Sequence, residues 1–198
     1  GVWIMAYTTI DDPSEYFTIT LYTGNGQDNR AITNSANAGN FQPDWLWYKE
    51  RSSTSSHRVF DSSRGASKRI EPDTTTGEET DTSNQKSFDS NGFTVGTSGS
   101  TNANGDTYVA WQWKANGGTT TTNTEGDTNV TLQANATAGF SIGTWDAGGS
   151  NAGAVGHGLG AAPEWIILKR RDGTSNWHVW HQSLGDGNNY VLLNSTGA

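Results

Sequence analysis

The feature that most constrains this fold is a stretch of sequence that occurs twice. Residues 43–51 read PDWLWYKER and residues 163–171 read PEWIILKRR, at an offset of 120 positions. Similarity at a fixed spacing, repeated in several blocks, is the signature of a duplicated structural unit. We therefore predict two modules that share one fold. The other matching pairs are Val59 with Val179, Phe60 with Trp180, Ser63 with Ser183 and Gly65 with Gly185 at the same offset, and residues 17–19 with residues 140–142 at an offset of 123.

The order of these blocks predicts how the chain is divided. Residues 14–116 form a complete first β module, and residues 138–198 form a second β module that is expected to be incomplete. Residues 117–137 are rich in Thr and Gly, which is typical of a linker. Residues 1–13 are interpreted as the end of a preceding module, and we expect residues 2–7 to pair with another strand.

Apolar residues alternate with polar ones in short segments, which indicates β-strands. Val109, Trp111 and Trp113 share one face of such a strand, and we expect the two Trp side chains to lie in the core. Residues 45–48 and 165–168 are apolar on both faces, which favours central strands covered on each side. No segment repeats its apolar residues with a helical period. We predict an all-β fold, an antiparallel β-sandwich or jelly-roll in each of two tandem duplicated modules.

The composition limits how a core can be built and which partners fit. Leu, Ile, Val and Phe together supply only 30 of 198 residues, so nine Trp and six Tyr must provide much of the buried apolar area. There is no Cys, which excludes disulfides and thiolate metal sites. The net charge of −8 argues against a nucleic-acid partner. No apolar run approaches the roughly 20 residues that a membrane span requires, so no membrane insertion is expected.

Four blocks of the first module follow one another in a recognisable order, namely residues 22–26, 41–51, 60–65 and 105–111. In this order they resemble a repeat module of structural proteins of marine and cyanobacterial phages, which is often labelled tail-fibre-like. The second copy is similar in residues 155–160, just before its repeated block. The resemblance covers nearly the whole chain.

The resemblance implies a structural or adhesion protein of the phage virion, most readily a tail fibre or another surface appendage that contacts the host surface. It implies a location at the virion surface, other virion subunits as partners, and a homo-oligomer, with a trimer favoured because phage fibres are commonly trimers. It carries over no catalytic residue and no cofactor. Two alternatives stay open, a carbohydrate-binding module of a secreted bacterial protein and a capsid decoration protein. A host surface glycan is the small ligand to test.

Two groups of residues are candidates for ligand binding. Trp177 is singled out as a ligand contact, because a Trp ring can stack on the apolar face of a sugar. Asn102, Asn104 and Asp106 place oxygen atoms at alternate positions, as a calcium loop does. They lack the distal Glu of such a loop, and the Asn-Gly pair at residues 104–105 favours a turn instead.

The remaining charged and ligating groups are given structural interpretations. His178 and His181 are three residues apart in a predicted strand, so their side chains point to opposite faces and do not suit a metal site. The acidic residues among positions 78–81 predict a solvated surface loop rather than a catalytic carboxylate pair. The basic cluster at residues 169–171 is expected to pair with local carboxylates such as Asp172. We therefore assign no metal and no catalytic residue.

Overall fold

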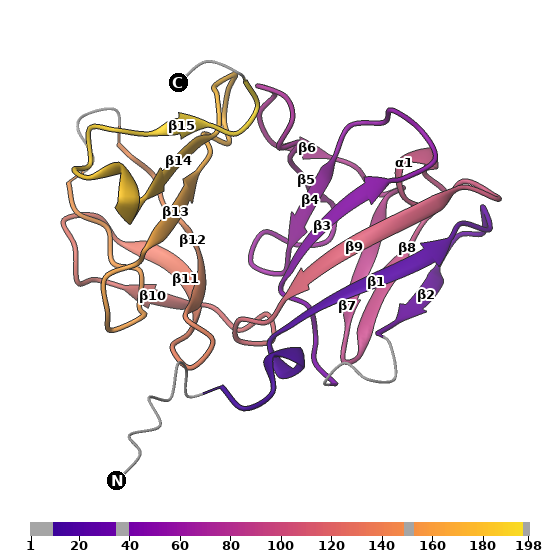
Figure 1. The fold of residues 1–198 in the computed structure, drawn as a ribbon, viewed down its shortest axis with the longest axis horizontal. Coiled ribbons are helices and arrows are strands. Elements are labelled where there is room, and N and C mark those ends of the chain that lie inside the picture. The colour runs from indigo at the N-terminus through magenta and orange to yellow at the C-terminus, as the bar shows by residue number, and fades with distance from the viewer. Residues whose placement is uncertain (1–9, 35–39, 149–152, 196–198) are drawn as a thin grey trace, which may run out of the picture.

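The computed structural model describes residues 10–34, 40–148 and 153–195, and strands joined by turns and loops make up most of it. This confirms the predicted all-β fold. Figure 1 shows two halves, the first from β1 to β9 and the second from β10 to β15. The first half contains η1 (Pro13–Glu15), β1 (Phe17–Thr23), β2 (Arg30–Thr33), β3 (Trp45–Glu50), β4 (Arg58–Asp61), β5 (Lys68–Arg69), β6 (Glu79–Thr80), β7 (Gln85–Asp89), β8 (Gly92–Val95), α1 (Gly99–Asn102) and β9 (Thr107–Trp113). The second half contains β10 (Thr121–Asn123), β11 (Val130–Asn135), β12 (Phe140–Thr144), β13 (Trp165–Leu168), β14 (His178–His181), η2 (Gln182–Leu184) and β15 (Val191–Leu192).

Two antiparallel sheets pack against each other in the first half, as predicted for a β-sandwich. One sheet has the strand order β1-β9-β3-β4 and the other has the order β2-β8-β7 (Figure 1). The main hydrophobic core lies between them, and both sheets contribute to it. Its buried residues are Leu46, Tyr48, Phe60 and Ala110 from the first sheet, and Ile32, Phe93 and Val95 from the second.

The inward face of β1 and β9 is partly polar. Thr18 and Thr20 of β1 are buried, and Gln112 of β9 donates a hydrogen bond from Nε2 to Thr20 Oγ1 over 2.7 Å. Tyr108 is fully buried and donates its hydroxyl proton to the carbonyl oxygen of Gly99 over 2.6 Å. Polar groups are tolerated inside a protein when they are hydrogen-bonded in this way. The apolar side chains of these two strands therefore lie largely on the other face.

Trp111 and Trp113 lie on that other face of β9, so the prediction that they belong to the core is wrong for the sandwich. Both are half-buried, whereas Ala110 and Gln112 are fully buried. Successive side chains of a strand point to opposite faces. Because Tyr108, Ala110 and Gln112 point into the core, the indole rings of Trp111 and Trp113 point outward.

The second half consists of two three-stranded antiparallel sheets, β10-β11-β12 and β13-β14-β15. Strands β10 and β11 both lie within residues 117–137, so part of the segment expected to be a linker is folded into a sheet. β11 also fastens the two halves together. Gln133 accepts a hydrogen bond from the backbone N–H of Gly118 over 2.8 Å and donates one to Ser63 Oγ over 2.7 Å.

The hairpins β3–β4 and β13–β14 have the same register. Their paired positions differ by 120 residues throughout, which agrees with the repeat found in the sequence. Duplication of the whole module stays a prediction, because β12 pairs with β11 and not with a counterpart of β9. The paired positions include Trp45 with Asp61 and Trp47 with Val59 in the first hairpin, and Trp165 with His181 and Ile167 with Val179 in the second.

The two hairpins differ in their neighbours. β3 lies between β9 and β4, so it is central in its sheet, as predicted. β13 pairs with β14 alone among the described strands, and the prediction of a central strand is wrong there. The two strands also differ in the exposure of their side chains. Leu46 and Tyr48 of β3 are fully buried, whereas Trp165 and Leu168 of β13 are 62% and 42% exposed.

Residues 2–7, which were expected to pair with another strand, lie outside the described residues. Across residues 10–34, 40–148 and 153–195, no helix has the length and apolar character needed to cross a membrane.

Candidate functional site

The outer face of the sheet β1-β9-β3 is apolar and reaches the solvent. On β1, Ile19 is 46% exposed and Leu21 is 61% exposed. Ile19 lies opposite Trp111 on β9, which in turn lies opposite Trp47 on β3. We call Ile19, Leu21, Trp47 and Trp111 the outer apolar face. A contiguous exposed patch of apolar residues commonly marks a surface that contacts another molecule.

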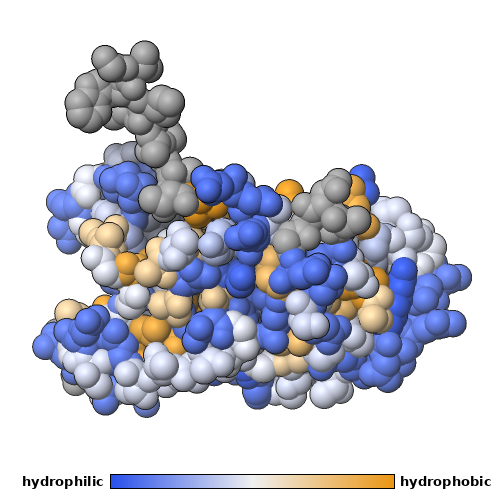
Figure 2. Space-filling model, turned by 90° about the horizontal axis from the view of Figure 1, so that it is seen from below, coloured by the Kyte–Doolittle hydropathy of each residue, from blue (hydrophilic) through white to orange (hydrophobic). Residues whose placement is uncertain are grey.

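Other apolar residues reach the solvent in the second half. Trp145 is 38% exposed, Trp165 is 62% exposed and Leu168 is 42% exposed. Figure 2 shows one face of the molecule on which hydrophobic residues are visible in a hollow between projecting parts that are mostly hydrophilic.

The two indole rings of the outer apolar face are held in place. The centroids of Trp47 and Trp111 lie 6.4 Å apart with an interplanar angle of 76°, an edge-to-face contact. Trp47 Nε1 also donates a hydrogen bond to His57 Nδ1 over 2.8 Å. Burial lowers the pKa of His57, and the charge of Asp73 opposes this effect only in part. A neutral imidazole with an unprotonated Nδ1 is the form that accepts this bond.

The second half covers one end of this outer face. Trp113 stacks against Phe140 of β12, with ring centroids 6.3 Å apart and an interplanar angle of 24°, and it contacts Phe17 at 4.8 Å. Trp45 lines a pocket together with Ile142. The rest of the face, where Ile19 and Leu21 lie, stays open to solvent.

Trp177, the residue singled out from the sequence as a ligand contact, is only 2% exposed. Its Nε1 donates a hydrogen bond to the backbone carbonyl oxygen of Glu71 over 2.9 Å. Glu71 belongs to the first half, so this indole packs where the two halves meet. In this structure Trp177 offers no open ring face on which a sugar could stack.

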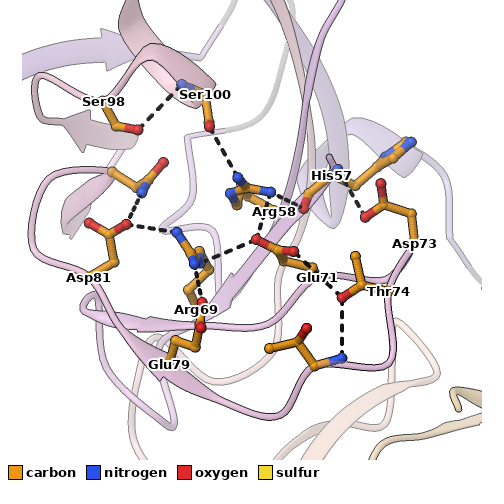
Figure 3. Close-up of polar contacts among 12 residues, drawn as sticks. His57, Arg58, Arg69, Glu71, Asp73, Thr74, Glu79, Asp81, Ser98 and Ser100 are labelled. Atoms are coloured by element: carbon orange, nitrogen blue, oxygen red, sulfur yellow. Dashed lines mark hydrogen bonds and ion pairs between the residues drawn. The ribbon is translucent and has the colours of Figure 1, made fainter. Parts of the chain in front are cut away.

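A cluster of charged side chains lies beside this contact (Figure 3). Glu71 forms ion pairs with Arg58 at 2.9 Å and with Arg69 at 3.5 Å. Arg69 also pairs with Asp81 at 2.8 Å and with Glu79. Burial lowers the pKa of Arg58, and the charge of Glu71 opposes this shift. The cluster joins strands β4 and β5 to the loop that follows them, and we interpret it as structural.

Glu78 connects the two halves. Its carboxylate pairs with Arg64 at 3.1 Å in the first half and with Arg171 at 2.8 Å in the second. Burial alone would raise the pKa of Glu78, but hydrogen bonds from Arg171 and Arg64 outweigh it and hold the pKa below its usual value. The side chain is 12% exposed, so the prediction of a solvated acidic loop is wrong at this position.

The basic cluster of the second half has mixed surroundings. Arg170 pairs with Asp172 at 2.7 Å, as predicted, and both side chains are exposed. Lys169 Nζ instead donates hydrogen bonds to the backbone carbonyl oxygens of Thr75 and Ser175, over 3.2 and 3.1 Å. Part of this cluster therefore contributes to the contact between the halves.

In the candidate calcium loop, the side-chain oxygen of Asn102 already accepts hydrogen bonds from other residues of the protein. Asn102 is fully buried in α1, and its Oδ1 accepts from Arg30 Nη1 over 3.0 Å and from the backbone N–H of Asn25 over 3.1 Å. A guanidinium at this oxygen stands where a cation would have to bind. Asn104 and Gly105 form a turn, with Gly105 at φ 90°, and Asp106 follows it. This geometry agrees with the turn interpretation.

His178 and His181 lie at the two ends of β14, opposite Leu168 and Trp165 respectively. His181 Nδ1 accepts a hydrogen bond from the backbone N–H of Ser183 over 3.1 Å. In the part of the chain that the structure describes, no group of three or more His, Cys, Asp or Glu side chains is placed to hold a metal ion.

The sequence analysis did not anticipate the buried carboxylate of Asp44. Asp44 is fully buried and accepts hydrogen bonds from the backbone N–H groups of Ala115, Gly117 and Gly118, over 2.7, 2.9 and 2.8 Å. It anchors the turn by which the chain leaves β9 for the second half. The available signal was the acidic residue that both repeats carry before their Trp, Asp44 and Glu164. The outer apolar face was missed as well, because alternation does not say which face of a strand is inside.

The comparisons with known proteins define the family and nothing further. No curated protein and no solved structure matches this chain. One family model matches residues 12–198, and its description is "Domain of unknown function (DUF7483)". The match extends over both halves and the segment that joins them. This chain therefore belongs to the DUF7483 family.

Proposed function

We propose that this chain is a structural and adhesive module of a phage virion, located at the virion surface in a tail fibre or another appendage. The observation that carries the proposal is the outer apolar face. A chain with few aliphatic residues keeps Ile19 and Leu21 on the outside, 46% and 61% exposed, beside two half-buried indoles. Such a face is stabilised when another surface covers it. The order of sequence motifs, which resembles a phage repeat module, supplies the biological setting.

Neighbouring virion subunits are the partners that this proposal favours, and a homotrimer is the preferred assembly. The outer apolar face supports contact rather than chemistry, since its side chains are aliphatic and aromatic and carry no reactive group. The fixed edge-to-face pair of Trp47 and Trp111 loses little conformational freedom when it is covered. The module is accordingly proposed to act without a cofactor and without catalysis.

Immunogold electron microscopy tests the location directly. Antibodies raised against this chain are applied to particles of the source phage, with particles stripped of their appendages as the control. We expect gold on tail fibres or other appendages of intact particles and its loss from stripped ones. Gold confined to the capsid shell would favour a decoration protein, and particles free of label would contradict a virion role.

A carbohydrate-binding module is the second candidate, favoured by the two indoles on the outer face. Trp111 and Trp47 are half-buried, so neither residue is fully withdrawn from solvent. A glycan array probed with the wild-type chain and with Trp111→Ala separates the two functions. Binding by a monomeric chain that is lost in Trp111→Ala supports the carbohydrate function. The assembly proposal instead predicts a wild-type chain that self-associates and gives no Trp111-dependent array signal.

A further inference from the structure

β13 has an open edge whose counterpart in the first half is covered by a strand. In the first half, β3 is flanked by β4 on one side and by β9 on the other. In the second half, β13 is flanked by β14, and none of the described strands pairs with its other edge. Exposed edges of this kind are sites at which another chain can add a strand.

The two hairpins are equivalent at the level of backbone hydrogen bonds. Ser62 N–H donates to the carbonyl oxygen of Asp44 over 2.9 Å, and 120 residues later Gln182 N–H donates to Glu164 over 2.9 Å. In an antiparallel pair, alternate residues direct their backbone groups to opposite edges. The backbone carbonyl group of Glu164 points toward β14, so the backbone groups of the other even-numbered residues, 166 and 168, point toward β14 as well. Trp165 and Ile167 therefore direct their N–H and C=O groups to the open edge.

β9 shows what fits against such an edge. Trp45 and Trp47 of β3 lie opposite Trp113 and Trp111 of β9, and Arg51 N–H donates to the carbonyl oxygen of Thr107 over 2.7 Å. By the same alternation, the odd-numbered residues of β9 bond to β3. The even-numbered residues bond to β1, where Lys114 N–H donates to Tyr16 over 2.8 Å.

The other flank of the open edge is also equivalent. β1 lies beyond β9 in the first half, and its residues 17–19 match residues 140–142 of β12 at an offset of 123. Ile142 and Thr144 of β12 line the same pocket as Ile167 and Leu168 of β13. β12 pairs with β11, and its second edge carries no strand within the described ranges. The position between β12 and β13 thus corresponds to the one that β9 fills between β1 and β3.

We propose that the open edge of β13 binds an extended segment of another polypeptide, which adds as an antiparallel strand in the register that β9 has on β3. The segment has the side-chain pattern of β9. It carries bulky apolar residues opposite Trp165 and Ile167, as Trp113 and Trp111 stand opposite Trp45 and Trp47, and a polar residue between them, as Gln112 has in β9. Binding covers the exposed side chains of β13 and satisfies its outward backbone groups. This site is separate from the outer apolar face.

A synthetic peptide with the sequence of residues 105–115 is the probe. Its binding to the intact 198-residue chain is measured by fluorescence anisotropy, with a scrambled peptide as the control. N-methylation at the positions of Val109 and Trp111 removes the N–H groups that would bond to β13. We expect it to weaken binding at least about tenfold, the effect of losing two hydrogen bonds. N-methylation at Tyr108 and Ala110 leaves the N–H groups that would bond to β13 in place, and this matched peptide variant should bind more tightly than the peptide N-methylated at Val109 and Trp111.

Substitution on the protein side separates the edge from other surfaces. Ile167→Pro removes an N–H group that points to the open edge and leaves pairing with β14 intact, since Pro is tolerated at an outward edge position. Ile167→Val keeps that group. We expect peptide binding to be lost in Ile167→Pro and retained in Ile167→Val. We also expect it to be retained in Ile19→Thr/Leu21→Thr, so that failure here is distinct from failure of the proposed function.

Three results would overturn the inference. The first is failure of the peptide to bind the wild-type chain. The second is equally tight binding of the peptide to Ile167→Pro and to Ile167→Val, when circular dichroism shows that both variants are folded. The third is self-association that Ile167→Pro abolishes while the peptide does not compete for it, because this would make a different segment of a second copy the occupant of the edge.

Discussion

Trp47 donates a hydrogen bond from its indole Nε1 to Nδ1 of His57 over 2.8 Å, and this bond ties the outer apolar face to a titratable group. Burial holds the pKa of His57 below its ordinary value of 6.5. The folded state therefore favours the neutral imidazole. Its contribution to stability is fully present above pH 6.5 and is lost as the pH falls through the lower pKa of the folded state.

We predict a loss of about 0.5–1.5 kcal/mol in the free energy of unfolding when the pH is lowered from 7.5 to below the folded pKa of His57, the usual value of one hydrogen bond. Urea unfolding followed by Trp fluorescence at a series of pH values measures it. His57→Phe is the control, because it removes the titrating group. A pH profile of the same shape in wild type and His57→Phe would contradict the assignment.

Glu78→Gln tests the contact between the halves. This substitution removes a charge that Arg64 and Arg171 share, and it leaves the nearly buried Arg64 with fewer partners. We expect a loss of about 1–3 kcal/mol in the free energy of unfolding, the cost of leaving a buried polar partner unsatisfied. Asp172→Asn is the matched control, since its pair with Arg170 is exposed and should leave stability unchanged. Equal effects of both variants would contradict our account of Glu78.

The pair Leu46→Ala and Ile166→Ala compares equivalent positions of the two hairpins. Leu46 is fully buried in the core between the two sheets of the first half, and its removal should cost about 2–5 kcal/mol. Ile166 is half-buried beside an open edge, so its removal should cost only about 1–2 kcal/mol. Chemical denaturation of both variants measures the difference. A larger loss for Ile166→Ala would mean that β13 is covered in solution.

Asp44→Ala removes the carboxylate that holds the turn after β9. Three backbone N–H groups then lose their acceptor, and we expect a loss of about 2–3 kcal/mol in the free energy of unfolding. Glu164 occupies the equivalent position of the second half but is exposed, so Glu164→Ala should have little effect. Thermal unfolding of the two variants provides the test. A stable Asp44→Ala variant would show that the turn is held by other contacts.

The sequence allowed the fold class and the equivalence of positions 120 residues apart to be predicted, because both follow from patterns within the sequence. The repeat at an offset of 120 located β3 and β13, and alternation showed which residues of β9 share a face. Alternation could not show which face is inside. Hydropathy placed Trp111 in the core, but Gln112 is buried instead, and its Nε2 donates a hydrogen bond to Thr20 Oγ1.

The candidate site was harder to predict, because it depends on contacts between distant segments. The Trp177 side chain is of a type that can stack on a ligand. Its hydrogen bond to the backbone carbonyl of Glu71, 106 residues away, shows instead that the indole is packed in the interior. The sequence around Glu78 predicts a solvated loop, but in the folded chain Arg171 of the second half lies beside its carboxylate. Neither contact leaves a local signal in the sequence.

The central claim is that the outer apolar face is covered by a partner subunit, and sedimentation equilibrium of the purified chain at micromolar concentration tests it most directly. Ile19→Thr/Leu21→Thr makes the most exposed part of the face polar, while Val191→Thr/Leu193→Thr changes two aliphatic residues of similar exposure elsewhere. We predict that the wild type and the second variant sediment as an oligomer and that Ile19→Thr/Leu21→Thr sediments as a monomer. A wild-type chain that remains a monodisperse monomer, or an oligomer that survives Ile19→Thr/Leu21→Thr unchanged, would contradict this account.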